Sequence, residues 1–376
     1  PDAGRSLEVG LPEVPKITVE VAIPDFGQVS VSELSRQSSS FNGYVVAPMQ
    51  VPTTDIDPQP DFVINEKAYQ DGTFPVSGTV MTTPAICRDV RFVKVDVYPV
   101  LSTPSKASIE AARQVTFELK INNGVGINEK QVERRPISPD LDNMYRKMFI
   151  NYDSLGLDVG STRDSNVRYL IISADSHIAS IQPLADWWTR AGIFVEVLGT
   201  SVTGSSQADV YSTIMDYYTN ENTEYVLLVG EVNEIALGNT GSQDPGDYNY
   251  QLLEGSDDYA DIALGRILHT DNNVIDHVVA RTLNYVLDPP ADGWLDKSML
   301  CAHGEQYPGK YTECCEFIRT FSYAIDQLIF DTYYPPEGAT HAMVEAAMTE
   351  GRGIVNYRGH GDNTYWTWAP DWDVQH

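Results

Sequence analysis

The chain has 376 residues, of which 42% are hydrophobic, and carries a formal net charge of −28. This length accommodates two or three domains with cores of their own, and the hydrophobic content excludes an intrinsically disordered protein. So acidic a surface repels nucleic acid and anionic membranes, and no apolar run approaches the roughly 20 residues that a membrane span needs.

Residues 1–125 show the pattern of an all-β domain. Polar and apolar side chains alternate in five runs, which are KITVEVAIP, QVSVSEL, GYVVAP, DVRFVKVDVYPV and RQVTFELKI. Alternation with a period of two, broken by Pro, Gly and Ser, is typical of strands with one face buried. The pattern therefore predicts an antiparallel β-sandwich.

Residues 126–166 are polar and charged, and we expect them to form a linker. They contain two dibasic pairs, Arg134–Arg135 and Arg146–Lys147, which we expect to be exposed. Each pair could be a processing site, or it could simply contribute to the solubility of the surface.

Strands and helices alternate across residues 167–376. The predicted strands are 167–173, 193–198, 224–230, 262–267, 298–303 and 353–357. The predicted helices are 180–192, 209–220, 274–286, 312–328 and 341–351. In the third helix the expected apolar face consists of Val274, Val278, Val279, Thr282 and Val286. This alternation predicts a mostly parallel sheet with helices on both faces.

Binding and catalytic sites in such sheets form beyond the carboxyl ends of the strands. His360 follows a predicted strand and stands between Gly359 and Gly361, which add no Cβ atoms beside it. It could act as a general base, with the Gly361 amide donating to a developing oxyanion. The alternative is a turn that needs two glycines and happens to hold a histidine.

Glu305 also follows a predicted strand, in the stretch CAHGEQ. Its carboxylate could accept a hydrogen bond from the His360 imidazole and fix its tautomer. An ordinary loop glutamate is the alternative, and His303 is a rival candidate for chemistry at the same strand end.

The stretch GSDDYADIALGRI offers the carboxylates of Asp257 and Asp261, with the Tyr259 carbonyl between them. Oxygen ligands from alternate residues of one loop suit calcium, although a solvated acidic turn is equally compatible with the pattern. Glu231 and Asp247 could add further ligands.

Trp366 and Trp368 follow His360 within a few residues. They could form a wall of a substrate pocket or cover the end of the sheet. The four cysteines, Cys87, Cys301, Cys314 and Cys315, are too few for a disulfide scaffold and lack the spacing of a zinc site.

Four blocks of residues 167–376 resemble the gingipain-like cysteine peptidases of family C25. They are VRYLIISADSHIASIQPLADWWTRAGIFVEVL, EYVLLVGEVNEI, GSDDYADIALGRI and GIVNYRGHGDNTYW. The stretches GLPEVPKITVEVAIP and DVRFVKVDVYPVLSTPS resemble the propeptide of the same family. The resemblance therefore covers nearly the whole chain.

The resemblance implies a caspase-like α/β catalytic domain and a secreted protein, outside the cell or on its surface. It implies that His360 is the catalytic histidine, that Glu305 orients it, and that Gly361 supplies an oxyanion-hole amide. It also implies calcium at the Asp257 loop and an acidic residue that sets specificity, for which Glu316, or less closely Glu313, is the match.

The nucleophile of the family is a cysteine on the strand after this histidine, and no cysteine follows His360 here. We therefore expect the chain alone to be inactive. One hypothesis is a secreted cysteine endopeptidase, present as a zymogen or processed fragment, whose partners are protein or peptide substrates and the C-terminal remainder of its own catalytic domain. The other is an inactive pseudo-peptidase that serves in binding or extracellular assembly. A cysteine encoded downstream would favour the first.

Overall fold

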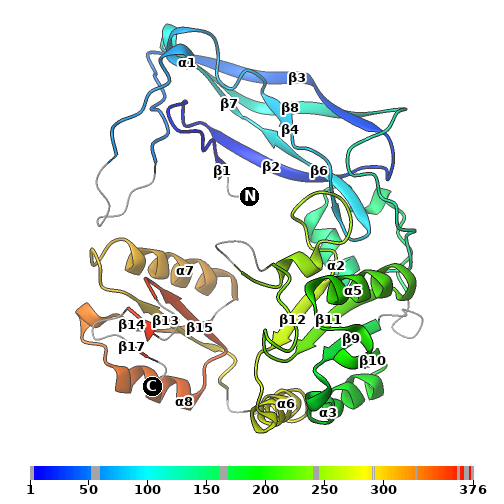
Figure 1. Cartoon of the computed structure of the whole chain (residues 1–376). Coiled ribbons are helices and arrows are strands. Elements are labelled where there is room, and N and C mark those ends of the chain that lie inside the picture. Colours follow the sequence, from blue (N-terminus) through cyan, green and yellow to red (C-terminus); the bar gives the residue numbers. More distant parts are fainter. Residues whose placement is uncertain are drawn as a thin grey trace. The chain divides into compact units, whose positions relative to one another are not determined.

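The structure is a computed structural model that describes residues 4–51, 60–160, 168–239, 245–289, 291, 293–326, 328–361, 365–367 and 372–373. The chain forms two compact units, Pro1–Leu283 and Asn284–His376 (Figure 1). Each unit contains a sheet of parallel strands, and the first also contains the antiparallel strands of the amino-terminal region.

The amino-terminal strands form two antiparallel sheets. One has the order β1 (Gly4–Arg5), β2 (Pro15–Ala22), β6 (Val90–Val97), β4 (Thr79–Met81), with β5 (Ala85–Cys87) also on β6. The other has the order β3 (Gln28–Asn42), β8 (Ser108–Asn122), β7 (Val100–Thr103). Buried Val93 and Val95 of the first sheet pack with Val31 and Phe117 of the second. The predicted antiparallel β region is confirmed, and its sheets face each other across a shared core.

The stretch GYVVAP is not a strand, so that prediction is wrong. Gly43, with φ +86°, ends β3, and the amides of Gly43 and Tyr44 both donate to the Ala107 carbonyl. Pro48 then forms only an isolated bridge with Pro12. Local alternation was present, but no continuous partner strand lies beside it among the described residues.

The predicted linker contains a packed helix, α2 (Pro139–Met148), which begins where the Ser138 hydroxyl accepts a bond from the Leu141 amide. Tyr145 of this helix is fully buried and packs against Phe149. Burial of the tyrosine ring explains why this charged segment is ordered.

The first dibasic pair is not exposed as predicted. Arg134 forms an ion pair with Asp25, and Arg135 donates to the Thr219 carbonyl at 2.7 Å, so both side chains lie against the fold. Arg146 is half exposed and pairs with acidic neighbours. These contacts do not test whether either dibasic pair is a processing site.

The first parallel sheet has the order β10 (Phe194–Gly199), β9 (Arg168–Ser173), β11 (Thr223–Val229), β12 (Ala263–Ile267). One face packs on α5 (Gln207–Glu221). The other face packs on α3 (Ile178–Arg190) and α6 (Asn272–Leu287). Figure 1 shows α5 on one side of the strands and α3 and α6 on the other. A parallel sheet covered on both faces is therefore confirmed.

Helix α6 exists as predicted, but its buried face differs. Ile275 and Val279 are buried and Leu283 packs against them, whereas Val274 and Val286 are exposed. The predicted apolar stripe begins at Val274, and the observed one begins one residue later, at Ile275. The observed stripe consists of Ile275, Val279 and Leu283, which are four residues apart, and it faces the sheet.

The second parallel sheet has the order β14 (Ile329–Tyr333), β13 (Lys297–Ala302), β15 (Ile354–Arg358). In β13, Leu300 packs on α7 (Tyr311–Asp326), while Met299 packs on α8 (His341–Glu350). Strand β14 was not predicted, because Asp331 interrupts its apolar run. Asp331 pairs with Arg352, whose side chain is nearly buried.

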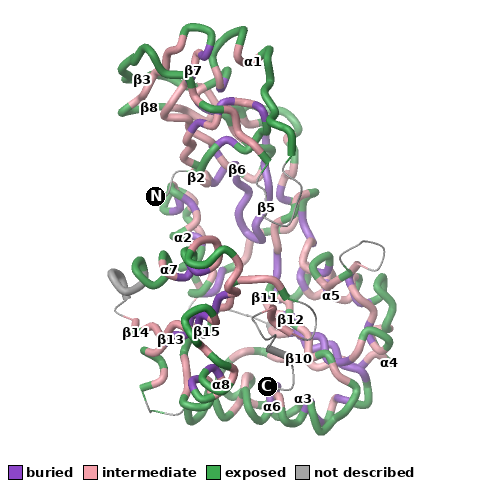
Figure 2. The backbone as a smooth tube through the Cα atoms, turned by 90° about the vertical axis from the view of Figure 1, so that its left-hand side faces the viewer, coloured by how far each residue is buried: buried purple, intermediate pink, exposed green. Residues whose placement is uncertain are grey.

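A buried arginine joins the antiparallel region to the first parallel sheet within the first unit. Arg88 occupies the turn between β5 and β6, at φ +47°, and this turn is among the buried segments in Figure 2. Its guanidinium donates to the carbonyls of Thr223 at 2.7 Å and Asp261 at 3.1 Å, and to the Asn222 side chain at 2.9 Å. Lys130 donates to the Arg88 carbonyl at 2.7 Å.

We predict that Arg88→Met destabilises the first unit by about 3–5 kcal/mol, because the buried carbonyls and the Asp89 carboxylate lose their cation. Urea unfolding followed by circular dichroism measures the change. Arg113→Met, on an exposed position of β8, is the matched control and should change stability by less than about 0.5 kcal/mol. Equal stability of the two variants would contradict the role given to Arg88.

Candidate active site

The candidate site lies at the carboxyl ends of β13 and β15, within the second unit. These strands are parallel neighbours, and Ala302 pairs with Arg358 in the register. The His303 amide continues the ladder by donating to the Arg358 carbonyl at 2.9 Å. The residues that follow, Glu305 on one strand and His360 on the other, are therefore brought to the same edge of the sheet.

The His360 imidazole contacts the Glu305 carboxylate, with Nε2 and Oε2 3.1 Å apart. An ionised carboxylate only accepts hydrogen bonds, so Nε2 carries the proton and Nδ1 has a free lone pair. The Tyr311 hydroxyl lies 3.0 Å from the same Nε2 and can only accept from it in this tautomer. Nδ1 has no hydrogen-bond partner in the described part of the chain, and the histidine side chain is 42% exposed.

Lys310 keeps Glu305 ionised. Its Nζ donates to Glu305 Oε1 at 2.6 Å. This bond, followed by the bond from His360, lowers the pKa of Glu305. The carboxylate thus remains an acceptor for the imidazole, and it would stabilise an imidazolium.

Lys310 and Tyr311 were missed from the sequence, although they come only five and six residues after Glu305. The loop turns back on itself at Gln306 and Lys310, which have positive φ angles of 54° and 49°. Non-glycine residues seldom adopt this conformation, so spacing alone gave no reason to expect these contacts.

Gly359 is required by close packing. A Cβ atom at this position would lie 2.3 Å from Tyr357 Oη and 2.8 Å from His303 Cβ. The Tyr357 hydroxyl donates to the His360 carbonyl at 2.6 Å, which holds the backbone of the histidine in place. Gly361 is exposed and forms an isolated bridge with Trp366, and its oxyanion role stays a prediction.

Trp366 stacks on Tyr357, with ring centroids 4.5 Å apart and an interplanar angle of 8°. It also packs against the buried cluster of Met299, Val344 and Ala347. This position covers the end of the sheet, one of the two alternatives for Trp366. A contact with substrate stays a prediction, and Trp368 lies outside the described residues.

The cysteines of the second unit are poorly suited to act as nucleophiles. Burial raises the pKa of Cys301 to about 12 and that of Cys315 to about 11. Cys314 is exposed on α7, and all four cysteines of the chain are free thiols. Among the described contacts, none joins a cysteine to His360.

Glu316, the candidate specificity residue, already has partners. Its carboxylate accepts bonds from Arg319 and from the Tyr334 hydroxyl, the latter at 3.0 Å. Glu313 is exposed on the same helix. A role for either carboxylate in substrate selection stays a prediction.

The candidate calcium ligands lie in the first unit and face backbone donors. Asp261 is buried, and its carboxylate accepts bonds from the amides of Arg88, Leu253 and Glu254 at 2.8–3.0 Å. Asp257 accepts from the amide of Ile86 at 2.9 Å.

Two further calcium candidates also have other neighbours. The ring of Tyr259 packs edge-on against Phe92, and Glu231 accepts a bond from the Val232 amide at 3.0 Å. Within the described residues, the carboxylates of Asp257, Asp261 and Glu231 do not converge as a metal-binding group. Calcium binding here stays a prediction.

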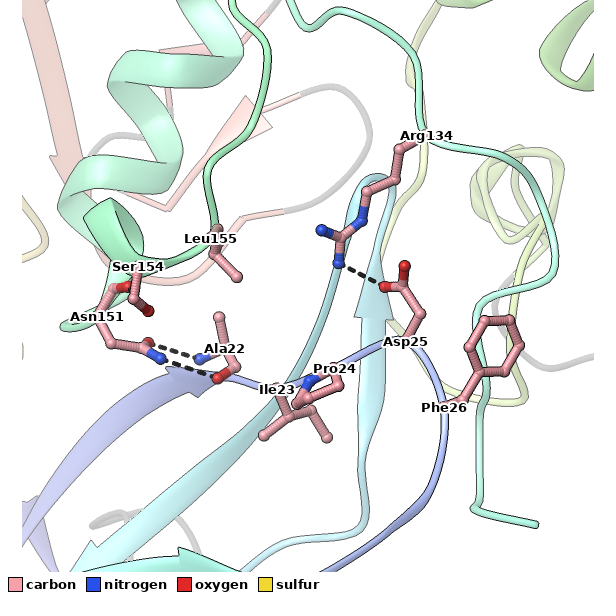
Figure 3. Close-up of a pocket in the computed structure, with 9 residues that line it drawn as sticks. All are labelled: Ala22, Ile23, Pro24, Asp25, Phe26, Arg134, Asn151, Ser154 and Leu155. Carbon is pink, nitrogen blue, oxygen red and sulfur yellow. Dashed lines mark hydrogen bonds and ion pairs between the residues drawn. The ribbon is translucent and has the colours of Figure 1, made fainter. Parts of the chain in front are cut away.

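A hollow in the first unit is a weaker candidate (Figure 3). It is lined by Ala22, Ile23, Pro24, Asp25, Phe26, Arg134, Asn151, Ser154 and Leu155. The charges of Asp25 and Arg134 neutralise each other, and the Asn151 amide bonds the backbone of Ala22. Neither histidine nor cysteine lines it, so we assign chemistry to the His360 site.

Comparison with protein families agrees with this geometry. A model described as peptidase family C25 matches residues 162–375, and a model of the C25 propeptide matches residues 2–158. The chain belongs to peptidase family C25. Its gingipain-like catalytic region follows a C25 propeptide region, and the propeptide match includes α2.

Known gingipains are similar over nearly the whole chain. Gingipain R1 of Porphyromonas gingivalis is 24% identical over 381 residues, which cover 96% of this chain and 37% of that protein. A Lys-gingipain of the same species is 23% identical over 387 residues, covering 97% and 22%. This chain therefore spans less than half the length of these two relatives.

A solved gingipain structure shares the fold. The crystal structure of the Arg-specific cysteine proteinase gingipain R matches with a TM-score of 0.51 and 23% identity, over 56% of this chain and 50% of that chain. At this identity the likeness supports the parallel α/β fold and leaves the site residues to be judged on their own geometry.

Asp261 makes the stability of the first unit depend on pH. Burial raises its pKa to about 6, above the value of about 3.9 in an unfolded chain. Its contribution to stability is therefore fully present below pH about 4 and is lost as the pH rises through about 6, by about 3 kcal/mol in total.

We predict that Asp261→Asn lowers stability at pH 4, because the single oxygen of the amide cannot accept from both sides and its nitrogen then faces the amide of Arg88 or those of Leu253 and Glu254. The substitution should also flatten the change in stability between pH 4 and pH 7. Urea unfolding at several pH values measures both effects. Asp153→Asn, on a side chain that is 90% exposed, should leave the profile unchanged. An unaltered slope in Asp261→Asn would contradict the burial argument.

Proposed function

We propose that the complete protein is a gingipain-type cysteine endopeptidase in which His360 is the general base. The observation that carries the proposal is the bond from His360 Nε2 to Glu305, because it leaves Nδ1 free to take a thiol proton. Membership of family C25 supports the reaction class.

In the proposed mechanism, Nδ1 accepts the proton of a cysteine thiol and the Glu305 carboxylate stabilises the resulting imidazolium. The thiolate attacks the scissile carbonyl carbon, and the Gly361 amide donates to the oxyanion. His360 then protonates the leaving amine, and water hydrolyses the thioester with His360 again as base.

We propose that the nucleophilic cysteine lies outside residues 1–376 and that the segment carrying it is a partner of the second unit. Support comes from the burial and high pKa of Cys301 and Cys315. The alternative, a pseudo-peptidase used for binding or extracellular assembly, requires that the full-length protein lack such a cysteine.

We propose protein or peptide substrates with a basic residue before the scissile bond. The chain carries 53 acidic against 25 basic residues, which attracts basic peptides. Glu316 binds the guanidinium of Arg319, and we propose that a substrate arginine takes the place of that side chain. The gingipains it resembles include an Arg-specific and a Lys-named enzyme.

We propose an extracellular or cell-surface location, in keeping with the expected secretion of this family. Across the described residues, every helix is too short or too polar to cross a bilayer. The acidic surface would keep such a protein soluble and suits a calcium-containing medium.

We predict that His360→Ala lowers peptide cleavage by the full-length protein to background, because the thiol loses the base that accepts its proton. Glu305→Gln should lower kcat by roughly 10²- to 10⁴-fold, since the imidazole loses its orienting acceptor. Hydrolysis of a fluorogenic arginyl or lysyl peptide measures both effects. His277→Ala, an exposed histidine on α6, is the control, and unchanged turnover in His360→Ala would end the assignment.

We propose that the propeptide region holds the peptidase latent. Cleavage at a protease site introduced after residue 158 should raise the rate of peptide hydrolysis once residues 1–158 dissociate. Arg88→Met should speed that dissociation, because Arg88 joins β5 and β6 to the first parallel sheet, while Arg113→Met should not. Equal activity before and after dissociation would refute the inhibitory role.

We further propose that calcium stabilises the first unit through Asp257, the Tyr259 carbonyl and Asp261, with Glu231 as an added candidate. A ligand that binds only the folded state raises Tm, so a calcium chelator should lower it. Asp257→Asn should reduce the shift, and Asp153→Asn should not. Identical melting curves with and without the chelator would count against this site.

A further inference from the structure

We propose that His303, Glu305 and His360 bind one Zn²⁺ ion and that this ion reversibly inhibits the peptidase. Within the described residues, they form the one group of histidine, cysteine and carboxylate side chains placed to share a metal, with ligand atoms all within 4.8 Å of one another. The binding site stands on geometry alone, whereas its inhibitory effect rests on the proposed function.

The distances suit a tetrahedral ion after small movements. Glu305 Oε2 lies 3.1 Å from His360 Nε2 and 3.8 Å from His303 Nδ1. Ligands bound to zinc at 2.0–2.1 Å with tetrahedral angles lie about 3.3 Å apart. Both contacts of Glu305 therefore need to change by only about 0.5 Å or less. The ligand atoms of the two imidazoles lie within 4.8 Å of each other, and rotation of the side chains can bring them closer.

His303 provides an independent reason to expect a ligand. Its Nδ1 is buried and has no hydrogen-bond partner among the described residues. Its contact with Glu305 Oε2, at 3.8 Å, is too long for a hydrogen bond. Buried polar atoms are nearly always satisfied, and a metal ion between these two atoms would satisfy both.

The surrounding groups select the type of ion. Two imidazoles and one carboxylate favour zinc over calcium, which prefers oxygen ligands. His360 is 42% exposed, so water can reach the fourth position. Lys310 binds Oε1 and leaves Oε2 for the ion, but its positive charge weakens binding, which suits a reversible site.

Zinc would switch the histidine to the wrong tautomer. Without metal, Nε2 carries the proton and Nδ1 is the base. An ion bound at Nε2 displaces that proton, so the neutral ring carries its proton on Nδ1 instead. Nδ1 can then no longer accept a proton from a thiol, and Tyr311 loses the hydrogen it accepts from Nε2.

The binding test uses the 376-residue chain, zinc and a chromophoric zinc chelator, with excess calcium present. We expect one zinc ion per chain and a zinc X-ray absorption spectrum with two imidazole nitrogens and oxygen ligands at about 2.0–2.2 Å. His303→Ala and Glu305→Gln should each weaken binding at least about tenfold. His277→Ala is the matched control and should bind as the wild type does.

The site is refuted if His303→Ala and Glu305→Gln bind zinc as tightly as the wild type, or if the spectrum lacks two imidazoles. Circular dichroism confirms that both variants are folded. In the full-length protein, the zinc concentration that halves peptide cleavage should rise at least about tenfold in His303→Ala. Zinc binding without inhibition would overturn the regulatory part only, and failure of His360 as base is detected separately by the His360→Ala variant without zinc.

Discussion

The hydrogen bond between His360 Nε2 and Glu305 Oε2 is the interaction on which the functional account depends. It fixes which nitrogen carries the proton and which one is free, and Lys310 keeps the carboxylate able to accept. The bond exists because two parallel strands end side by side. The sheet register aligns the two strand ends, and the loop after β13 adds the lysine that pairs with the carboxylate.

A second constraint lies in the first unit, far along the sequence from the histidine. Arg88, Lys130, Glu254 and Asp261 form a buried polar junction between the antiparallel region and the first parallel sheet. Burying these charges is costly unless every partner is present, so the junction favours one arrangement of the two parts over all others.

The sequence predicted those features that depend on the local hydrophobic pattern and on the order of the strands. Strands β9, β11, β13 and β15 have short apolar runs, and residues just after parallel strands must share an edge, so His360 and Glu305 could be paired in advance. Contacts that depend on an irregular backbone could not be predicted. Lys310 and Tyr311 reach the site only because Gln306 and Lys310 adopt positive φ angles.

Long-range packing decided the other differences. Alternation in GYVVAP could not reveal that no continuous partner strand lies beside it, and the two apolar stripes of α6 could not be ranked without the sheet. The acidic loop around Asp261 matches a cation site in composition, and the sequence did not reveal that backbone amides from two segments also donate to that carboxylate. Composition shows which side-chain atoms can accept hydrogen bonds, but not which donors the fold places beside them.

Nitrogen-15 NMR of the chain labelled only at its seven histidines tests the central claim most directly. In metal-free buffer at pH 8, with His360 assigned by its loss in His360→Ala, the account predicts a proton on Nε2 and none on Nδ1. A ring protonated at Nδ1, or one that exchanges freely between the two tautomers, would contradict it.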